Sequence, residues 1–510
     1  MSKRYELSDD SVVVVIGSGA GGGTVANELA QQGIDVVCLE AGKRLTLADV
    51  ENDLVAMDQK MTWADKRLGA PAWICKTVGG TTMRWSGVTP RFRDFEFKPR
   101  STYGAMDDTN LIDWPLTLEE IEPYYDKAES KMGISGTHDM PPSFETSNYQ
   151  VLKAGGQRIG YKEITSSRSA INSIARDGRP ACRQIGFCWS GCAIGAKWST
   201  LYTEIPKAET TGRFELRAEA MAIKLKHDDK GRIRSVVYAD AEGNVHEQKA
   251  RAVCVAGNVA ETTRLLMNSN SSRYPDGLGN HSGHLGRNYM RHVMSLTFGV
   301  MPGPVNFYKG PRQSGLILDE QRSDASRGFA GGYIIETVAD QPFGIANYAG
   351  GWGQDIADFL EQYTNLAGCW VTGEDPPEAD NRISLHPTER DAYGLPVPVL
   401  KYRDHSNSTA MKAHAIQQCE AIYDSLGASR LESRPDIGHG CHNMGTARMS
   451  ERPEDGVTNR WGQVHDMPNL FVSDGSVFTA SGAPNPTLTI VALAIRQAEH
   501  IRDAMARREI

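Results

Sequence analysis

The chain opens with a short apolar run, residues 12–16, that ends in a glycine-rich turn. An unbroken run of this length, without alternation of polar and apolar positions, is typical of a strand buried on both faces. Apolar residues at helical spacing then continue as far as Gly33, and a second apolar run, residues 34–39, closes on Glu40. The pattern predicts a strand–turn–helix–strand unit at the start of the fold.

The turn in this unit has the spacing Gly17-x-Gly19-x-x-Gly22. In a nucleotide-binding unit the first glycine allows the tight turn, the second lets the backbone approach a pyrophosphate, and the third lets helix pack on strand. The pyrophosphate lies against the free N–H groups and the positive dipole end of the helix. Glu40, eighteen residues after Gly22, is placed to bind a pair of ribose hydroxyls. These features predict a dinucleotide site for NAD or FAD, and the Ala-Gly pair after Glu40 favours FAD.

The following part of the chain contains a helix and several strand signals. A helical pattern covers residues 115–134. Three apolar segments, 214–225, 233–238 and 253–256, are separated by turns rich in glycine and acidic residues. They predict a three-stranded meander inserted in the nucleotide-binding domain.

The second half of the chain adds further strands and a long closing helix. Strand candidates at 294–300 and 332–335 alternate with loops rich in glycine and proline, which predicts a second, sheet-containing domain. A last strand, 469–473, and a last helix, 488–504, are expected to complete the sheet begun at residue 12. We therefore expect two discontinuous domains: a nucleotide-binding domain of residues 1–100, 200–292 and 436–510, and a substrate domain of residues 101–199 and 293–435.

Length, composition and charge are ordinary for a soluble globular protein. The chain has 510 residues, of which 40% are hydrophobic and 23% charged, and its net charge of −8 argues against a nucleic-acid or anionic-membrane surface. No apolar run approaches the ~20 residues that span a bilayer. The first ten residues contain no hydrophobic segment, so the sequence by itself predicts a cytoplasmic protein, or a periplasmic one if a signal-bearing partner exports it folded. Nine cysteines in a chain of this length do not indicate a disulfide framework.

Four sequence blocks resemble the glucose–methanol–choline family of FAD oxidoreductases, from end to end of the chain. The resemblance is nearest to the branch with the gluconate, fructose and glucose dehydrogenase large subunits and the glycoside 3-dehydrogenases. It implies an α/β fold, with a Rossmann-like FAD-binding domain and a second, α+β substrate domain. The blocks are Gly17 to Gly22 with Glu40, Val78 to Thr82, Ala256 to Asn258 leading to Leu265-Leu266, and His442 to Thr446 with Asn485 to Leu488.

The resemblance also implies roles for residues at matching positions. Gly79, Gly80 and Thr81 would follow the pyrophosphate and flavin, Met221 would hold adenine, Asp474 and Gly475 would meet the ribityl-phosphate region, and Pro486 and Thr487 would place N–H groups on the flavin pyrimidine. Members with covalent FAD use a histidine in the block after the two glycines. Residues 82–85 are Thr-Met-Arg-Trp instead, which predicts non-covalent FAD.

Two residues are expected to carry the chemistry of alcohol oxidation. The reaction removes a hydride and a hydroxyl proton, and the proton needs a base such as histidine. His442 occupies the family's base position, and Asn485 matches the second active-site position, where an amide can hold the substrate oxygen. His439, which lies outside the motif, and Cys441 are interpreted as structural.

A second chemical signal is the spacing Cys182-x5-Cys188-x3-Cys192. Closely spaced cysteines with intervening glycines wrap readily around an iron–sulfur core. The glucose dehydrogenase large subunits that resemble this chain hold a 3Fe–4S cluster with three cysteines, although Ala193 here replaces a proline that often follows the last one. No fourth ligand for zinc is evident nearby. Plain packing or a disulfide is the alternative interpretation.

The sequence leaves the electron acceptor and the substrate open. A dehydrogenase would pass electrons, through the cluster if present, to a cytochrome or quinone, with a small subunit as a further partner. An oxidase would return them to O₂ as hydrogen peroxide and would need no cluster. A non-catalytic flavin-fold protein would be expected to have lost His442 or Asn485, and both are present. A sugar or glycoside is the first expected substrate and a non-sugar alcohol the second.

Overall fold

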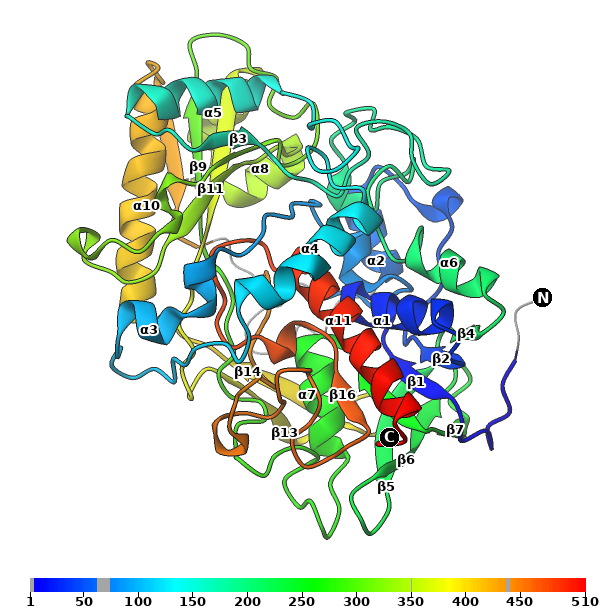
Figure 1. The fold of residues 1–510 in the computed structure, drawn as a ribbon. Coiled ribbons are helices and arrows are strands. Elements are labelled where there is room, and N and C mark those ends of the chain that lie inside the picture. Colours follow the sequence, from blue (N-terminus) through cyan, green and yellow to red (C-terminus); the bar gives the residue numbers. More distant parts are fainter. Residues whose placement is uncertain (1–3, 62–73, 350, 437–440) are drawn as a thin grey trace.

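The computed structural model describes residues 4–61, 74–349, 351–436 and 441–510, and Figure 1 shows their arrangement. The helices in these ranges are α1 (Ala20–Gln31), α2 (Leu54–Met61), α3 (Pro99–Tyr103), α4 (Leu118–Met132), α5 (Ser147–Arg158), α6 (Glu204–Thr210), α7 (Asn258–Asn268), α8 (Pro342–Tyr348), α9 (Gln354–Glu361), α10 (Ser406–Asp424) and α11 (Thr487–Ala506).

The strands form four sheets. They are β1 (Val13–Ile16), β2 (Val36–Leu39), β3 (Ile164–Ser166), β4 (Phe214–Arg217), β5 (Met221–His227), β6 (Ile233–Ala239), β7 (Val245–Lys249), β8 (Ala252–Val255), β9 (Val293–Val300), β10 (Gly315–Ile317), β11 (Tyr333–Thr337), β12 (Leu366–Gly373), β13 (Arg382–Arg390), β14 (Pro396–Lys401), β15 (Arg430–Arg434) and β16 (Leu470–Val472). The chain is therefore of the mixed α/β class, as the sequence predicts.

The N-terminal unit belongs to a five-stranded parallel sheet with the order β16-β8-β1-β2-β4. Strand β1 is its centre and is buried along its whole length, which is why its sequence is continuously apolar. Helix α1 crosses between β1 and β2, and α11 packs against both α1 and α4 (Figure 1). The predicted strand–turn–helix–strand unit and the closing strand and helix are confirmed.

The predicted meander was only partly right. A three-stranded antiparallel sheet is present, but its strands are β5, β6 and β7. The apolar segment 214–225 is two strands, and its first part, β4, joins the parallel sheet, as does β8. Strand β7 escaped prediction because its sequence, Val-His-Glu-Gln-Lys, is mostly polar and solvent-facing. A fully buried parallel strand and a meander strand are both short apolar runs, so periodicity alone does not separate them.

A six-stranded antiparallel sheet with the order β15-β9-β12-β11-β10-β3 forms the second centre of packing. Strands β9 and β11 confirm the two strand predictions in this region. Helices α5 and α10 pack against this sheet (upper left in Figure 1). Its own apolar cluster includes Phe298, Tyr333 and Tyr423, none more than 2% exposed. The residue limits of the two proposed domains stay a prediction.

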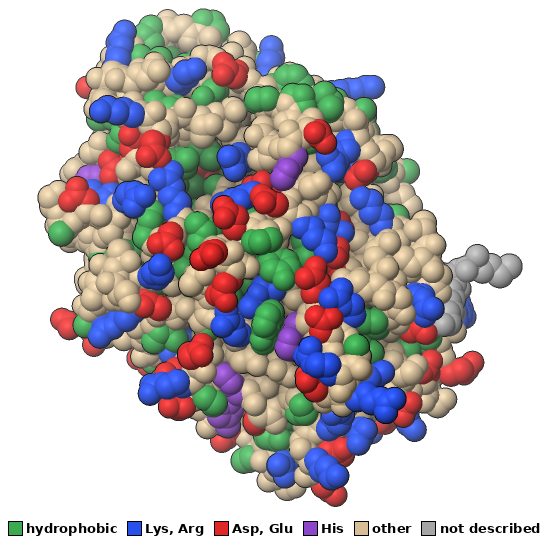
Figure 2. Space-filling model, viewed as in Figure 1, with side chains coloured by type: hydrophobic (Ala, Val, Ile, Leu, Met, Phe, Trp, Pro, Cys, Tyr) green, Lys and Arg blue, Asp and Glu red, His purple; other side chains and the backbone are tan. Residues whose placement is uncertain are grey.

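The surface of the described chain mixes charges of both signs. Figure 2 shows lysine and arginine side chains interspersed with aspartate and glutamate over the face that it presents. No helix among the described residues has the length and hydropathy that a bilayer-crossing helix needs.

The close packing of α1 on the sheet generates a stability prediction. A Cβ on Gly21 would overlap the carbonyl oxygen of Ser473, which follows β16. Gly21→Ala is expected to lower the free energy of unfolding by about 3 kcal/mol or more, because the backbone oxygen has no room to withdraw. Thermal melting followed by circular dichroism would measure the loss. Gly303→Ala is the control, since a Cβ there meets nothing within 4 Å, and it should stay within about 1 kcal/mol of the parent. Equal melting temperatures for the two variants would contradict the prediction.

Candidate active site

A cavity lies at the carboxyl ends of the parallel strands, where open α/β sheets bind their ligands. It runs past the turn after β1, the acid after β2, the turn after β8 and the turn after β16. It is closed on the other side by residues of the second sheet and by segment 84–88. The residues predicted from sequence that line it are Gly17, Gly19, Glu40, Gly80, Thr81, Met221, His442, Asp474, Gly475, Asn485, Pro486 and Thr487.

Two predicted glycines do not line the cavity but shape it. A Cβ on Gly22 would overlap the carbonyl oxygen of Gly17 and press on Ala256, so this glycine is where the helix packs on the strands. Gly79 has a φ of +95° and supports the turn from the side. Gly80, next in the chain, lies against Gly19, so the two glycine-rich segments meet back to back at the cavity wall.

Two helix N-termini open on this cavity without a side-chain cap. Helix α1 has Gly19 as its N-cap, and helix α11 has Pro486, and neither makes a side-chain capping bond. Uncapped N–H groups and a helix dipole favour an anion or a hydrogen-bond acceptor at this position. The cavity is therefore suited to a phosphate-bearing group at α1 and an electron-rich ring at α11, which fits FAD.

Ser18 connects the three segments at the phosphate end. Its hydroxyl donates to Glu40 Oε2 at 2.7 Å and accepts from the Gly79 N–H at 2.9 Å. Its carbonyl oxygen accepts from the hydroxyl of Thr200 at 2.6 Å. Ser18 occupies a variable position of the glycine motif, and the sequence gives no signal of this role.

The buried carboxylates of the wall are well supplied with hydrogen-bond donors. Glu40 accepts from Ser18 and from the Gly42 N–H at 2.9 Å, while burial raises its pKa. Asp474 accepts from the Ser476 N–H at 2.8 Å and from the Thr262 hydroxyl at 2.6 Å, and burial again raises its pKa. Each acid is thus held in a fixed position beside the cavity.

His442 lies at the far end of the cavity with its Nδ1 2.9 Å from Nδ1 of His292. Burial, and then the neighbouring His292, lowers the pKa of His442 well below its usual value of 6.5. The ring is therefore neutral at pH 7. Its backbone φ of +59° is uncommon for a residue other than glycine, and such outliers gather at functional sites.

Asn485 is held by a buried acid of the second sheet. Glu336, on β11, accepts hydrogen bonds from Trp370 Nε1 and the Thr372 hydroxyl, both at 3.0 Å, and from the side chains of Gln313 and Asn485. Burial raises the pKa of Glu336 to about 7. Asn485 Oδ1 is buried and has no hydrogen-bond partner in the described part of the chain. The amide is therefore oriented by the protein, with its oxygen left free to accept.

None of the three predicted metal cysteines lines the cavity, and their sulfur atoms, all of them in the described part of the chain, do not all lie within 4.8 Å of one another. Cys188 is buried, Cys182 and Cys192 are half-buried, and all nine cysteines of the chain are free thiols, so the disulfide alternative is wrong. Trp189, next to Cys188, lines the cavity, and the guanidinium of Arg312 stacks on its ring. The buried Lys197 amine donates to the carbonyl oxygens of Met83 and Trp85, both at 2.9 Å, and burial lowers its pKa to about 8.

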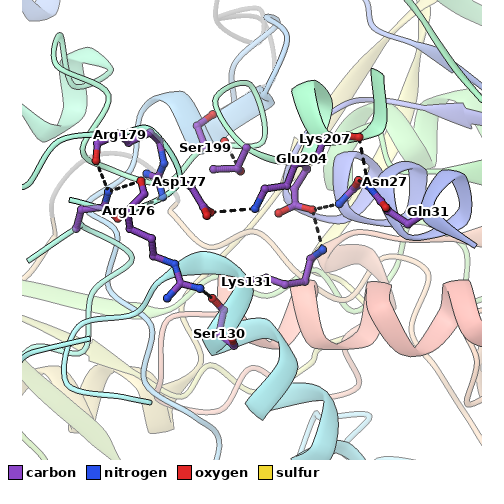
Figure 3. A network of polar contacts seen from close by, with 12 residues as sticks. Asn27, Gln31, Ser130, Lys131, Arg176, Asp177, Arg179, Ser199, Glu204 and Lys207 are labelled. Carbon is purple, nitrogen blue, oxygen red and sulfur yellow. Dashed lines mark hydrogen bonds and ion pairs between the residues drawn. The ribbon is translucent and has the colours of Figure 1, made fainter. Parts of the chain in front are cut away.

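A polar network fastens the segment that leads into the cysteines (Figure 3). Arg179 donates to the carbonyl oxygen of Ala196 at 3.2 Å, and Arg176 donates to that of Ser130 on α4 at 2.5 Å. Further pairs join α6 to the segment, to α4 and to α1: Asp177 with Lys207 at 2.9 Å, Glu204 with Lys131 at 3.2 Å, and Glu204 with Asn27 at 2.5 Å. The cysteine segment is thus tied to the same helix whose N-terminus opens on the cavity.

Several residues of the site could not be predicted from the sequence. Ser18 stands at a variable position of the glycine motif, and Gln313 and Trp370 on the wall stand in no motif. Glu336 and His292 do not line the cavity; Glu336 stands in no motif, and His292 stands alone before the apolar run of β9. The signal that the sequence offers for His292 is a solitary histidine at the start of a buried strand. His439 lies outside the residues that the structure describes.

Ser18→Ala tests whether the phosphate end of the cavity depends on this side chain. The change leaves a buried carboxylate and a buried N–H short of a partner, which costs about 1–3 kcal/mol of stability. We expect a lower melting temperature and a tenfold or larger rise in the Kd for FAD, measured by flavin fluorescence with the apoprotein. Ser11→Ala is the control, because its hydroxyl bonds only to Asp9 at the surface. Unchanged FAD affinity in Ser18→Ala would show that the connection is dispensable.

Comparison with known proteins agrees with this geometry. Two family models, both described as GMC oxidoreductase, match residues 113–294 and 377–494. The 2-methyl-1,2-propanediol dehydrogenase of Mycolicibacterium austroafricanum is 32% identical, over 97% of this chain and 95% of its own. Paromamine 6'-oxidase of Streptomyces fradiae is also 32% identical, over 97% and 92% of the two chains.

A further relative and a solved structure extend the comparison. The fructose dehydrogenase large subunit of Gluconobacter japonicus is 28% identical over 96% of this chain and 97% of its own, in line with the branch that the sequence resembles. Formate oxidase of Aspergillus oryzae shares the fold, with a TM-score of 0.70 over 99% of this chain and 100% of the other at 16% identity. The chain belongs to the GMC oxidoreductase family and is an FAD enzyme that acts on alcohol groups.

Proposed function

We propose that the protein oxidises an alcohol group of a sugar or glycoside, with non-covalent FAD as the acceptor of the hydride. The observation that carries the proposal is that His442, Asn485 and two uncapped helix N-termini face one cavity. An unprotonated base, an amide on the same cavity wall and a place for an electron-rich ring are suited to alcohol oxidation.

In the proposed reaction each side chain has a limited task. FAD, when bound, supplies the two-electron acceptor for the hydride. His442 accepts the hydroxyl proton, and its lowered pKa leaves it unprotonated at neutral pH and ready to do so. Asn485, whose amide NH₂ donates one hydrogen to Glu336, would hold the reacting oxygen with its second N–H. The N-terminus of α11 favours the negative charge that arises as the substrate is oxidised.

FAD is proposed to lie along the cavity, with each part of the cofactor beside a different set of wall residues. The α1 N-terminus with Gly19 and Gly80 would hold the pyrophosphate, Glu40 the ribose and Met221 the adenine. Asp474 and Gly475 would meet the ribityl-phosphate region, and Pro486 and Thr487 the flavin pyrimidine. The FAD domain would comprise residues 1–100, 200–292 and 436–510, and the substrate domain 101–199 and 293–435. No histidine lies between residues 82 and 85, which supports a non-covalent cofactor.

The substrate class is proposed from the wall and from the relatives. Gln313 and Asn443 join Asn485 as amides on the wall near His442, and amides bind hydroxyl-rich molecules through both donors and acceptors. Three relatives are named for fructose, paromamine and 2-methyl-1,2-propanediol. Each of these compounds carries several polar groups on one molecule. A sugar or glycoside is the first candidate, and a non-sugar alcohol is the second.

The electron acceptor is proposed to be a cytochrome or quinone. Electrons would pass to it through an iron–sulfur cluster on Cys182, Cys188 and Cys192, and a small subunit would be a further partner. The position of Trp189 on the cavity wall, within the same loop, supports a short path from flavin to these cysteines. A one-electron centre would also convert a two-electron oxidation into single steps. The second candidate function is an oxidase that makes hydrogen peroxide, which the relation to an oxidase supports.

Replacing the proposed base tests the mechanism. His442→Ala should leave FAD bound and slow flavin reduction by about 10²–10⁴, because general-base assistance is lost. Asn485→Ala should also slow it, to a smaller extent. In the parent protein the rate should keep its plateau below pH 6.5, since the lowered pKa keeps His442 unprotonated there. Stopped-flow reduction by D-fructose, D-gluconate or 2-methyl-1,2-propanediol provides the measurement. Reduction of His442→Ala at the parent rate would place the base elsewhere.

Iron analysis beside acceptor assays tests the electron path. Anaerobically purified protein should contain about three irons and matching sulfide per FAD, and the oxidised cluster should give an electron paramagnetic resonance signal. Cys188→Ser should lose the iron and keep FAD, whereas Cys254→Ser, in the buried strand β8, should keep both. Dye reduction without oxygen should exceed peroxide formation with it. Iron-free protein with full turnover on oxygen would identify an oxidase with structural cysteines.

A further inference from the structure

We propose that His292 is a positioning residue that holds His442 in the tautomer whose Nε2 carries no hydrogen. The inference rests on the proposed function, in which His442 accepts the proton of the substrate. Nothing in the sequence assigns His292 a role, and it lies 150 residues from His442 in the chain.

The two rings are joined through equivalent nitrogen atoms. Nδ1 of His442 and Nδ1 of His292 are 2.9 Å apart, and the rings meet edge to face at 80° with centroids 4.8 Å apart. A hydrogen bond between two nitrogens needs one proton. One Nδ1 must therefore donate and the other must accept, and the remaining contacts of His292 decide which is which.

The other nitrogen of His292 faces acceptors only. Nε2 lies 3.5 Å from the carbonyl oxygen of Ser481, and the backbone of Gly482 also favours the protonated form. Carbonyl oxygens cannot donate, so this nitrogen must carry the hydrogen. Burial lowers the pKa of His292 to about 4, so the ring is neutral and holds one proton only. Nδ1 of His292 is consequently bare and can only accept.

The tautomer of His292 determines the tautomer of His442. Its Nδ1 must donate to His292, and because this ring is also neutral, its Nε2 must be bare. In the described part of the chain Nε2 has no hydrogen-bond partner, while the residue lines the cavity. In the opposite tautomer Nε2 would carry a hydrogen and could not accept one from a hydroxyl. His292 thus determines which nitrogen is the base.

The backbone holds the two histidines in register. Met290 and Met444 form an isolated antiparallel bridge with N–H···O distances of 3.0 and 2.9 Å, which joins the two segments two residues from His292 and from His442. Ser481, whose carbonyl oxygen faces Nε2 of His292, is held in place as well, because its hydroxyl accepts from the Asp375 N–H at 2.9 Å. His292 is 2% exposed, so water does not compete for its nitrogens.

Proton transfer changes little else in this arrangement. When the substrate hydroxyl gives its proton to Nε2, the O–H bond breaks and an N–H bond forms on His442, which becomes an imidazolium. Its Nδ1–H continues to point at the lone pair of His292, so the ring keeps its orientation. Burial and His292 are the causes that lower the pKa of His442, and among the described residues no carboxylate contributes. The imidazolium is therefore disfavoured, and the proton is readily given up again after the transfer.

The tautomer can be measured directly on the FAD-loaded protein. Ring-¹⁵N histidine labelling, with His442→Ala to assign the signals, distinguishes a bare nitrogen from a protonated one. We expect His442 in the parent protein to be protonated at Nδ1 and bare at Nε2. In His292→Leu, which removes the acceptor, the proton should redistribute towards Nε2. A parent His442 that carries its hydrogen on Nε2 would overturn the inference, whatever the activity.

The rate of flavin reduction gives a second test. His292→Leu should reduce its flavin roughly 10- to 100-fold more slowly than the parent, with normal FAD content and little change in KM. His292→Asn keeps an oxygen acceptor near the position of Nδ1 and should recover most of the rate. His500→Leu is the control, since that ring stacks on Trp461 at the far end of α11. A His292→Asn variant as slow as His292→Leu would contradict a role through the acceptor.

A double variant separates this inference from the proposed function. If His292 acts through His442, then His292→Leu should add no further loss to His442→Ala. Fully additive losses would overturn the inference and leave His442 as the base. Conversely, a His442→Ala variant that reduces its flavin at the parent rate would refute the proposed function, while the tautomer seen by nuclear magnetic resonance would still stand or fall by itself.

Discussion

The close approach of helix α1 to the ends of the parallel strands is the constraint on which the site depends. Side chains at Gly21 and Gly22 are excluded by backbone atoms that follow β16 and β1. The helix begins directly at the strand ends with Gly19 as its N-cap, so no side chain caps its first N–H groups, and its first residues line the cavity. The same approach brings Glu40 under Ser18, so the sheet, the turn and the cofactor wall form one unit.

The second sheet completes the site from the opposite side. It contributes Glu336 and Trp370 from its strands and His292 from the entry to β9, and the bridge between Met290 and Met444 joins this entry to the loop of His442. The chemistry therefore depends on how the two packed units meet, and not on either of them alone.

The sequence predicted the parts of the site that lie in local motifs. The glycine turn, Glu40 and the residues around 80, 474 and 486 line the cavity because each stands at the end of a predictable strand or the start of a helix. The meander was misassigned because buried parallel strands and meander strands share one apolar pattern. Ser18, His292 and Glu336 act through partners 22 to 150 residues away, and no short-range pattern encodes such contacts. The fold class could thus be predicted, while the orientation of the catalytic groups required the structure.

The polar groups of the cavity divide into those already satisfied and those still available. Glu40 and Asp474 have their oxygens engaged by donors of the chain, so they hold positions and leave little capacity for chemistry. His442 Nε2 and Asn485 Oδ1 are acceptors without a donor among the described residues. An alcohol brings a hydroxyl hydrogen that satisfies one of them, whereas the carbonyl product brings none. In the proposed reaction the proton stays on His442, whose Nε2–H would donate to the carbonyl oxygen of the product, so release of the product would be favoured once that proton is lost.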